Sequence, residues 1–168
     1  MPGSSVFDDF DLSFLLEAAR LVDSKLALLE LEERGSEDPD GRGIFDRAEH
    51  IMGFGLVACQ TYVTASASRF RLDWKQALAL GPRHECGHSI VYLVNALANY
   101  WKHSPEWTPP LSKRAQETLN AISKLGVDVE SSYPTTNALA TLLRPHPPQI
   151  ERVVPFLTQW RGCLQDYE

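Results

Sequence analysis

Six polar residues recur at helical spacing between positions 83 and 103, in a stretch that is otherwise strongly apolar. They are His84, His88, Tyr92, Asn95, Asn99 and His103, separated by four, four, three, four and four positions. Side chains three or four positions apart share one face of a helix, so the spacing predicts one helix over 83–103 with a polar face. Because unpaired polar groups are costly to bury, that face must be hydrogen-bonded, hydrated, metal-bound or in contact with another chain.

The N-terminal part of this stretch matches a metal-binding motif. Residues 84–88 (HECGH) have the HExxH spacing, in which two imidazoles one helical turn apart hold a zinc ion and the glutamate activates a zinc-bound water. On this interpretation the zinc ligands are His84, His88 and a third residue, His103 or Glu106, with Glu85 as the general base. The chain would then be a zinc-dependent hydrolase.

The same residues carry a second pattern, an arginine followed five positions later by a histidine. Arg83 and His88, with the polar His84 directly after the arginine, resemble the Arg-x(4–6)-His motif of bacterial HEPN domains. Residues 99–103 (NYWKH) are similar to the second half of that family's Arg-Asn-x-x-x-His variant, with Ala98 in place of the arginine. The chain therefore resembles HEPN-domain proteins over its motif and, more loosely, over its helical core.

The HEPN resemblance implies an all-α bundle that acts as a metal-independent endoribonuclease of the toxin or phage-defence type, with its cleft at a homodimer interface. Arg83 would stabilise the phosphate charge and His88 would be the general acid or base, since guanidinium grips phosphate and imidazole titrates near neutral pH. His84, Asn99 and His103 would position the substrate. The expected partners are a second copy of the chain, RNA, and an antitoxin or regulatory protein, and no cofactor is required.

A third interpretation of the polar face is purely structural. Buried histidine, tyrosine and asparagine side chains commonly hydrogen-bond one another and fix how helices pair. Asn95 and Asn99 could set the register between two copies of this helix, as a buried asparagine does in coiled coils. The protein would then be a non-catalytic dimeric interaction module.

The rest of the chain is predicted to be helical and to form one domain. Period-3.6 patterns predict helices over about 9–34, 44–70, 72–80, 111–125, 137–143 and 150–164. No stretch alternates with period two, so residues 1–168 are expected to form a single all-α bundle of about five main helices. Residues 1–8 are expected to be frayed and residues 35–43 (GSEDPDGRG) to form a flexible loop. The small residues Gly53 and Gly55 would let another helix approach closely.

Composition limits the partners and the compartment. The net charge of −6 argues against a surface built for bulk nucleic-acid binding, so any RNA would be engaged only at a local basic site. Three cysteines without CxxC spacing are typical of reduced thiols, and the acidic N-terminus lacks the basic region of a signal peptide. No apolar run approaches the roughly 20 residues of a membrane span. We therefore expect a cytoplasmic protein.

Overall fold

The described part of the chain is entirely helical. The computed structural model describes residues 9–167, so the segment that we predict to be frayed, 1–8, lies outside the described residues. Within that range there are seven α-helices and two short 3-10 helices, and no strand. Five of the α-helices have 12 or more residues, which confirms the predicted all-α bundle of about five main helices.

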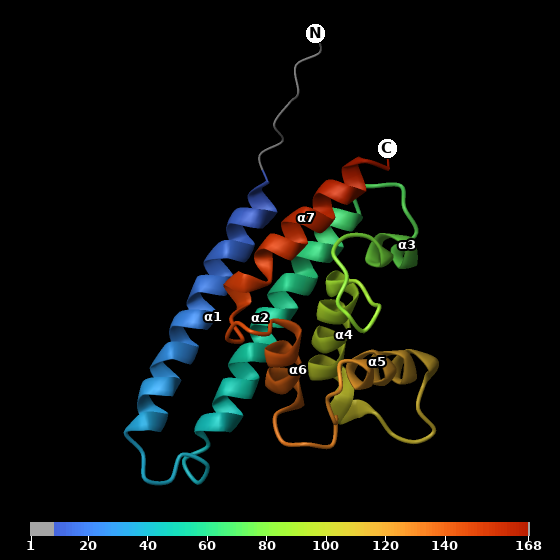
Figure 1. Ribbon diagram of the computed structural model, residues 1–168. Helices are drawn as coiled ribbons and strands as arrows, with labels where there is room; N and C mark the ends of the chain where they lie inside the picture. Colours follow the sequence, from blue (N-terminus) through green and yellow to red (C-terminus); the bar gives the residue numbers. More distant parts are fainter. Residues whose placement is uncertain (1–8, 168) are drawn as a thin grey trace.

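The two longest helices form an antiparallel hairpin (Figure 1). α1 (Phe10–Arg34) begins at Asp9, whose carboxylate accepts the N–H of Leu12 at 3.0 Å and so caps the first turn. α2 (Ile44–Ala67) runs back along α1 after a loop over residues 35–43. This loop lies where it is predicted, and its flexibility stays a prediction.

α4 (Ile90–His103) packs beside α2 and is the most buried helix. Val91, Val94, Leu97 and Ala98 have no exposed surface. The predicted close approach of helices at small residues is confirmed, because a Cβ at Gly53 would lie 2.1 Å from the indole of Trp101. This packing fixes the position of α4 against the hairpin.

Four shorter helices complete the bundle. They are α3 (Trp74–Ala79), α5 (Lys113–Lys124), α6 (Pro134–Leu142) and α7 (Val154–Gln165), with the 3-10 helices η1 (Ser104–Glu106) and η2 (Ile150–Arg152). α3 is tied to α7 because Nε1 of the buried Trp160 donates to the carbonyl of Ala77 at 2.7 Å. α5 packs mainly on α4 and lies across it in Figure 1. The result is a space beside α4 with α3 and α5 as its walls.

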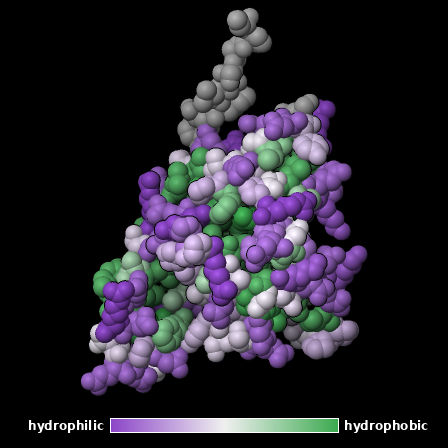
Figure 2. All heavy atoms as spheres, in the orientation of Figure 1, coloured by the Kyte–Doolittle hydropathy of each residue, from purple (hydrophilic) through white to green (hydrophobic). Residues whose placement is uncertain are grey.

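The distribution of hydrophilic residues over the surface and the hydropathy of the helices are consistent with this helical bundle. On the face drawn in Figure 2, hydrophilic residues cover the right-hand edge, over α3 and α5. None of the helices within residues 9–167 is both long and apolar enough to cross a membrane.

Candidate functional site

Residues 83–89 form a tight turn, and the prediction that the helix starts at Arg83 is wrong. Gly87 has φ of 90°, in a backbone region that residues other than glycine rarely adopt, and the N–H of His84 donates to the carbonyl of His88 at 2.9 Å. Arg83 and Ser89 form an isolated antiparallel bridge. α4 starts only after Ser89, whose hydroxyl accepts the N–H of Tyr92 at 3.0 Å. His84 and His88 therefore do not lie on the helix that carries the rest of the polar face.

Two side chains of the turn, those of Ser89 and Arg83, hold it in place. Ser89 is 2 % exposed and its hydroxyl also donates to the carbonyl of Leu78 at the end of α3. The guanidinium of Arg83 donates to the carbonyl of Gly87 at 2.8 Å and to that of Ala79 at 3.4 Å. Arg83 is exposed and keeps further N–H donors, because a guanidinium has five. It is thus fixed in place and still able to bind an anion.

His88 lines a hollow of about 340 Å³. Its ring lies against the ring of Tyr92, with centroids 4.8 Å apart. Burial, followed by the positive charges of Lys124 and Arg83, lowers the pKa of His88 from its usual value of 6.5. His88 is consequently neutral at pH 7 and can accept a proton. Arg83, Lys75 and Tyr92 line the same hollow.

This hollow is one end of a groove that follows α4. A neighbouring hollow of about 470 Å³ shares Lys75, Tyr92 and Glu117 with it, and a third of about 180 Å³ shares Asn99 and Arg114 with the second. The groove therefore runs from the turn at His88 to the far end of α4. The polar face of α4 forms its floor, while α3 and α5 form its walls.

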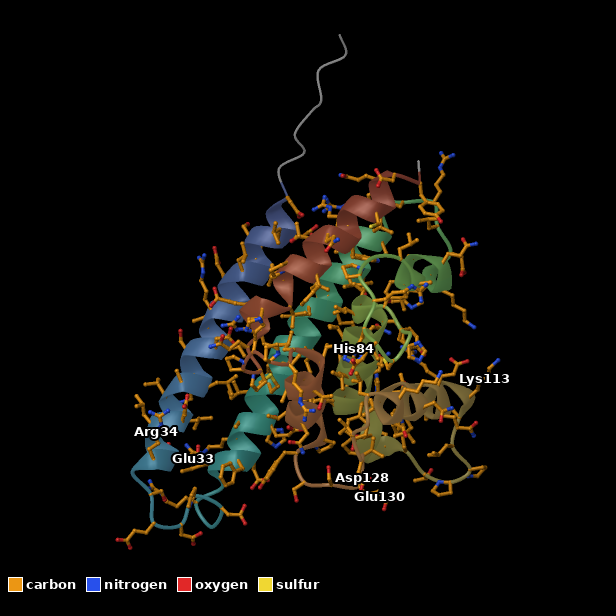
Figure 3. The ribbon with its side chains drawn as sticks, in the orientation of Figure 1. Glu33, Arg34, His84, Lys113, Asp128 and Glu130 are labelled. Carbon is orange, nitrogen blue, oxygen red and sulfur yellow. The ribbon has the colours of Figure 1, made fainter. Side chains whose placement is uncertain are left out.

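Basic residues outnumber acidic residues in the lining of the groove, although the protein as a whole has a net charge of −6. The lining contains four basic residues, Lys75, Arg83, Lys113 and Arg114, and two acidic residues, Glu106 and Glu117. Figure 3 labels His84, in the turn ahead of α4, and Lys113, at the outer end of α5. The groove is thus a local basic site of the kind that an acidic chain needs in order to bind a polyanion.

The middle of the polar face is hydrogen-bonded within the chain. Nε2 of Gln60, on α2, donates to Oδ1 of Asn95 at 2.8 Å and to Oδ1 of Asn99 at 3.0 Å. Nζ of Lys102 donates to Oε1 of Gln60 at 2.6 Å, and Arg114 donates to Oδ1 of Asn99 at 3.4 Å. The asparagine oxygens thus pair α4 with α2 of the same chain, rather than with α4 of a second copy as the coiled-coil interpretation predicts.

The remaining candidate residues are dispersed. His84 lies in the turn, where its Nδ1 accepts the N–H of Cys86 at 3.2 Å. His103 lies at the other end of α4, with Nδ1 3.4 Å from a carboxylate oxygen of Glu106. α4 has 14 residues, about 20 Å at 1.5 Å per residue. The proposed zinc set of His84, His88 and either His103 or Glu106 is therefore not brought together.

No group of three potential metal ligands occurs among the histidines, cysteines and carboxylates of the described residues. Glu85 is exposed at the tip of the turn. The HExxH chemistry requires both histidines on one side of a helix. In this chain the positive φ of Gly87 is incompatible with a helix, and residues 84–88 form a turn instead. These residues do not fit the zinc geometry that the motif implies.

Sequence reasoning missed two basic residues of the groove wall and one residue that supports its floor from α2. Gln60 lies 35 positions before Asn95, and no local pattern joins them. Lys113 and Arg114 carried a usable signal, because basic residues in the first turn of a helix oppose its dipole. A placement that is locally unfavourable is one mark of a functional site.

Comparison with known proteins adds no relative. No family model matches the chain, nor does any curated protein or solved structure. The HEPN resemblance thus rests on the residues of the turn and the end of α4 alone, and the groove has to be interpreted from its own chemistry.

Proposed function

We propose that the groove along α4 binds a strand of RNA and that the protein cleaves it at the His88 end without a metal ion. The observation that supports this most is that Arg83 and His88, the two residues of the HEPN-like motif, line one hollow of a basic groove. A neutral imidazole beside two cations, Arg83 and Lys75, suits attack on a phosphodiester.

The reaction uses the ribose 2′-hydroxyl as nucleophile. His88 takes the 2′-hydroxyl proton as the 2′-oxygen attacks phosphorus, the bond to the 5′-oxygen breaks, and that oxygen takes a proton from water. The products are a 2′,3′-cyclic phosphate and a 5′-hydroxyl. Arg83 and Lys75 stabilise the negative charge that grows on the phosphate oxygens. The lowered pKa of His88 keeps it in the basic form at neutral pH.

RNA cleavage in the presence of EDTA tests this proposal. His88→Ala should lower the cleavage rate by about 10²-fold or more, the usual contribution of a general base, and Arg83→Ala should also lower it. His146→Ala and Arg144→Ala are the matched controls, because both residues are exposed in a loop outside the groove. Wild-type cleavage that survives His88→Ala unchanged would refute the assignment, as would cleavage that EDTA abolishes.

We also propose that the protein is a homodimer that pairs through the outer face of α1. Phe14, Leu21 and Leu28 are 75 %, 73 % and 58 % exposed and recur every seven positions, a spacing typical of helices that pair. If two α1 helices cross antiparallel with Leu21 at the twofold axis, Phe14 faces Leu28 of the partner subunit. Glu17 then faces Lys25 of the partner subunit, so the charges beside the apolar stripe are complementary.

Sedimentation measures this association directly. Leu21→Glu places two like charges at the twofold axis and should give a monomer at concentrations where the wild-type chain is a dimer. Tyr167→Glu makes the same kind of change at a residue that is 65 % exposed, away from α1, and should stay dimeric. A wild-type chain that sediments as a monomer would exclude the dimer, which is also the arrangement that the interaction-module alternative requires.

A further inference from the structure

Two buried amides form the floor of the groove, half-way along α4. Asn95 and Asn99 are 8 % and 5 % exposed, and both line the 470 Å³ hollow. Their oxygens accept hydrogen bonds from Gln60 at 2.8 and 3.0 Å. Their amide nitrogens have no acceptor within the described residues. Neither nitrogen is among the fully buried polar atoms that lack a partner, so both open onto the groove and can donate to whatever occupies it.

Lys102, which does not line the groove, determines which end of the Asn95 and Asn99 amides faces Gln60. A lysine ammonium only donates hydrogen bonds, so Lys102 must meet the oxygen of Gln60, which it does at 2.6 Å. Gln60 is then left with its nitrogen towards α4, and both asparagines must offer it their oxygens. Arg114, which also only donates, reaches the same oxygen of Asn99 at 3.4 Å. These hydrogen bonds orient both asparagine amides so that their N–H groups, rather than their carbonyl oxygens, face the groove.

The spacing and surroundings of these N–H groups indicate which ligand they suit. Asn95 and Asn99 are one helical turn apart, about 6 Å along the axis. Lys113 and Arg114 line the same hollow, and Lys75 joins it to the His88 hollow. Paired N–H donors below cationic side chains suit a chain of regularly spaced, negatively charged acceptors, as in a phosphodiester backbone.

We infer that Asn95 and Asn99 form a backbone-binding subsite for the strand that His88 cleaves, and that Gln60 and Lys102 are positioning residues that aim the two amides into the groove. The identity of the ligand rests on the proposed function. The inference goes beyond the HEPN-like motif, because that motif specifies neither Asn95 nor Gln60 and leaves the residue type at Lys102 open. Neither positioning residue touches the reacting phosphate.

Gln60→Glu tests the inference without changing a residue of the groove lining. A glutamate at position 60 accepts from Lys102 and has nothing to donate, so both asparagines must turn their nitrogens towards it and present oxygens to the groove. Among the surrounding groups only Arg114 loses an acceptor, the oxygen of Asn99, and Arg114 is exposed and can donate to water instead, so the fold should be retained. Lys102→Arg keeps a pure donor and should behave as wild type. Gln159→Glu, at an exposed site on α7, is the control for the added charge.

The probe is a fluorescent, single-stranded 2′-O-methyl oligoribonucleotide, which lacks the attacking hydroxyl and so reports binding without cleavage. Loss of amide bonds to charged phosphate should weaken binding of Gln60→Glu by about 10-fold or more. The dependence of affinity on salt should keep its slope, because no lysine or arginine contact is removed. Lys102→Arg and Gln159→Glu should bind within about twofold of wild type.

The outcomes separate this inference from the proposed function. Wild-type affinity in Gln60→Glu would overturn the inference alone, and so would an equal loss in Gln159→Glu, since charge would then explain both. Failure of the wild-type chain to bind the oligonucleotide would overturn the inference together with the proposed function. Binding that depends on Gln60, in a chain that leaves unmodified RNA intact, would support the subsite and refute the cleavage.

Discussion

Replacing Gly87 by alanine should destabilise the protein, and the sign of this effect tests the turn at residues 83–89. Gly87 has φ of 90°, and a Cβ added there would meet nothing within 4 Å. The change therefore introduces no clash, and its effect comes from the backbone alone. Holding a residue with a Cβ at positive φ costs about 1–2 kcal/mol. Gly87→Ala should lower the free energy of unfolding by that amount.

A continuous helix from Arg83 to His103 requires the opposite result. Alanine is favoured over glycine inside a helix by about 0.5–1 kcal/mol, so Gly87→Ala would then stabilise the protein. Two other glycines supply controls of known sign, because a Cβ at either one also meets nothing within 4 Å. Gly126 has φ of 80° and should respond as Gly87 does. Gly162 lies within α7, so Gly162→Ala should raise the free energy of unfolding of the protein.

Urea denaturation followed by far-UV circular dichroism measures all three variants. The slope of the unfolding free energy against urea should be unchanged, so that a shift in midpoint reports stability alone. A Gly87→Ala variant that is more stable than wild type, with Gly126→Ala less stable in the same series, would refute the turn and restore the helix through His84 and His88.

Three further predictions concern the start of α4 and the charge state of His88. Ser89→Ala removes the cap on Tyr92 N–H and leaves the carbonyl of Leu78 without its donor. It should therefore destabilise the protein by about 2–3 kcal/mol. Ser112→Ala, at the exposed cap of α5, should cost about 1 kcal/mol, and urea denaturation measures both variants. Lys124→Met removes a positive charge that helps to lower the pKa of His88, so an NMR titration of the His88 ring should show a higher pKa in the variant. The folded-state pKa of His88 lies below 6.5, so the unfolded chain binds this proton more readily than the folded chain. His88 should therefore lower the free energy of unfolding of the wild-type protein only as the pH falls below 6.5. His88→Gln should lack this loss of stability, and a loss that persists in His88→Gln would contradict the assignment.

The helices could be predicted because their signals are local. Period-3.6 patterns and capping residues marked α1, α2 and α7 close to their observed bounds, and Gly53 marked a close helix contact. The start of α4 was missed because the polar residues keep helical spacing from His84 onwards even though the backbone does not. Ser89, directly before the first unbroken apolar run, was the signal that should have decided this boundary.

The groove could not be predicted because it depends on contacts between distant segments. Arg83 and His88 were chosen as a pair from a motif, and the turn places both on one hollow. Nothing near Asn95 or Asn99 in sequence announces that Gln60 holds their oxygens. The same face was expected to pair with a second copy, because periodicity identifies a buried polar face without naming the helix that covers it.

The two walls of the groove are attached to the rest of the molecule in different ways. α3 is fastened from both sides, by Ser89 at the turn and by Trp160 of α7. α5 rests mainly on α4, and Arg114 reaches across to Asn99 at 3.4 Å, a long hydrogen bond. The two walls are thus fastened to different parts of the molecule, α3 to the turn and to α7, and α5 to α4 itself. A shift of α5 along α4 would therefore change the width of the groove without moving α3 or the hairpin of α1 and α2.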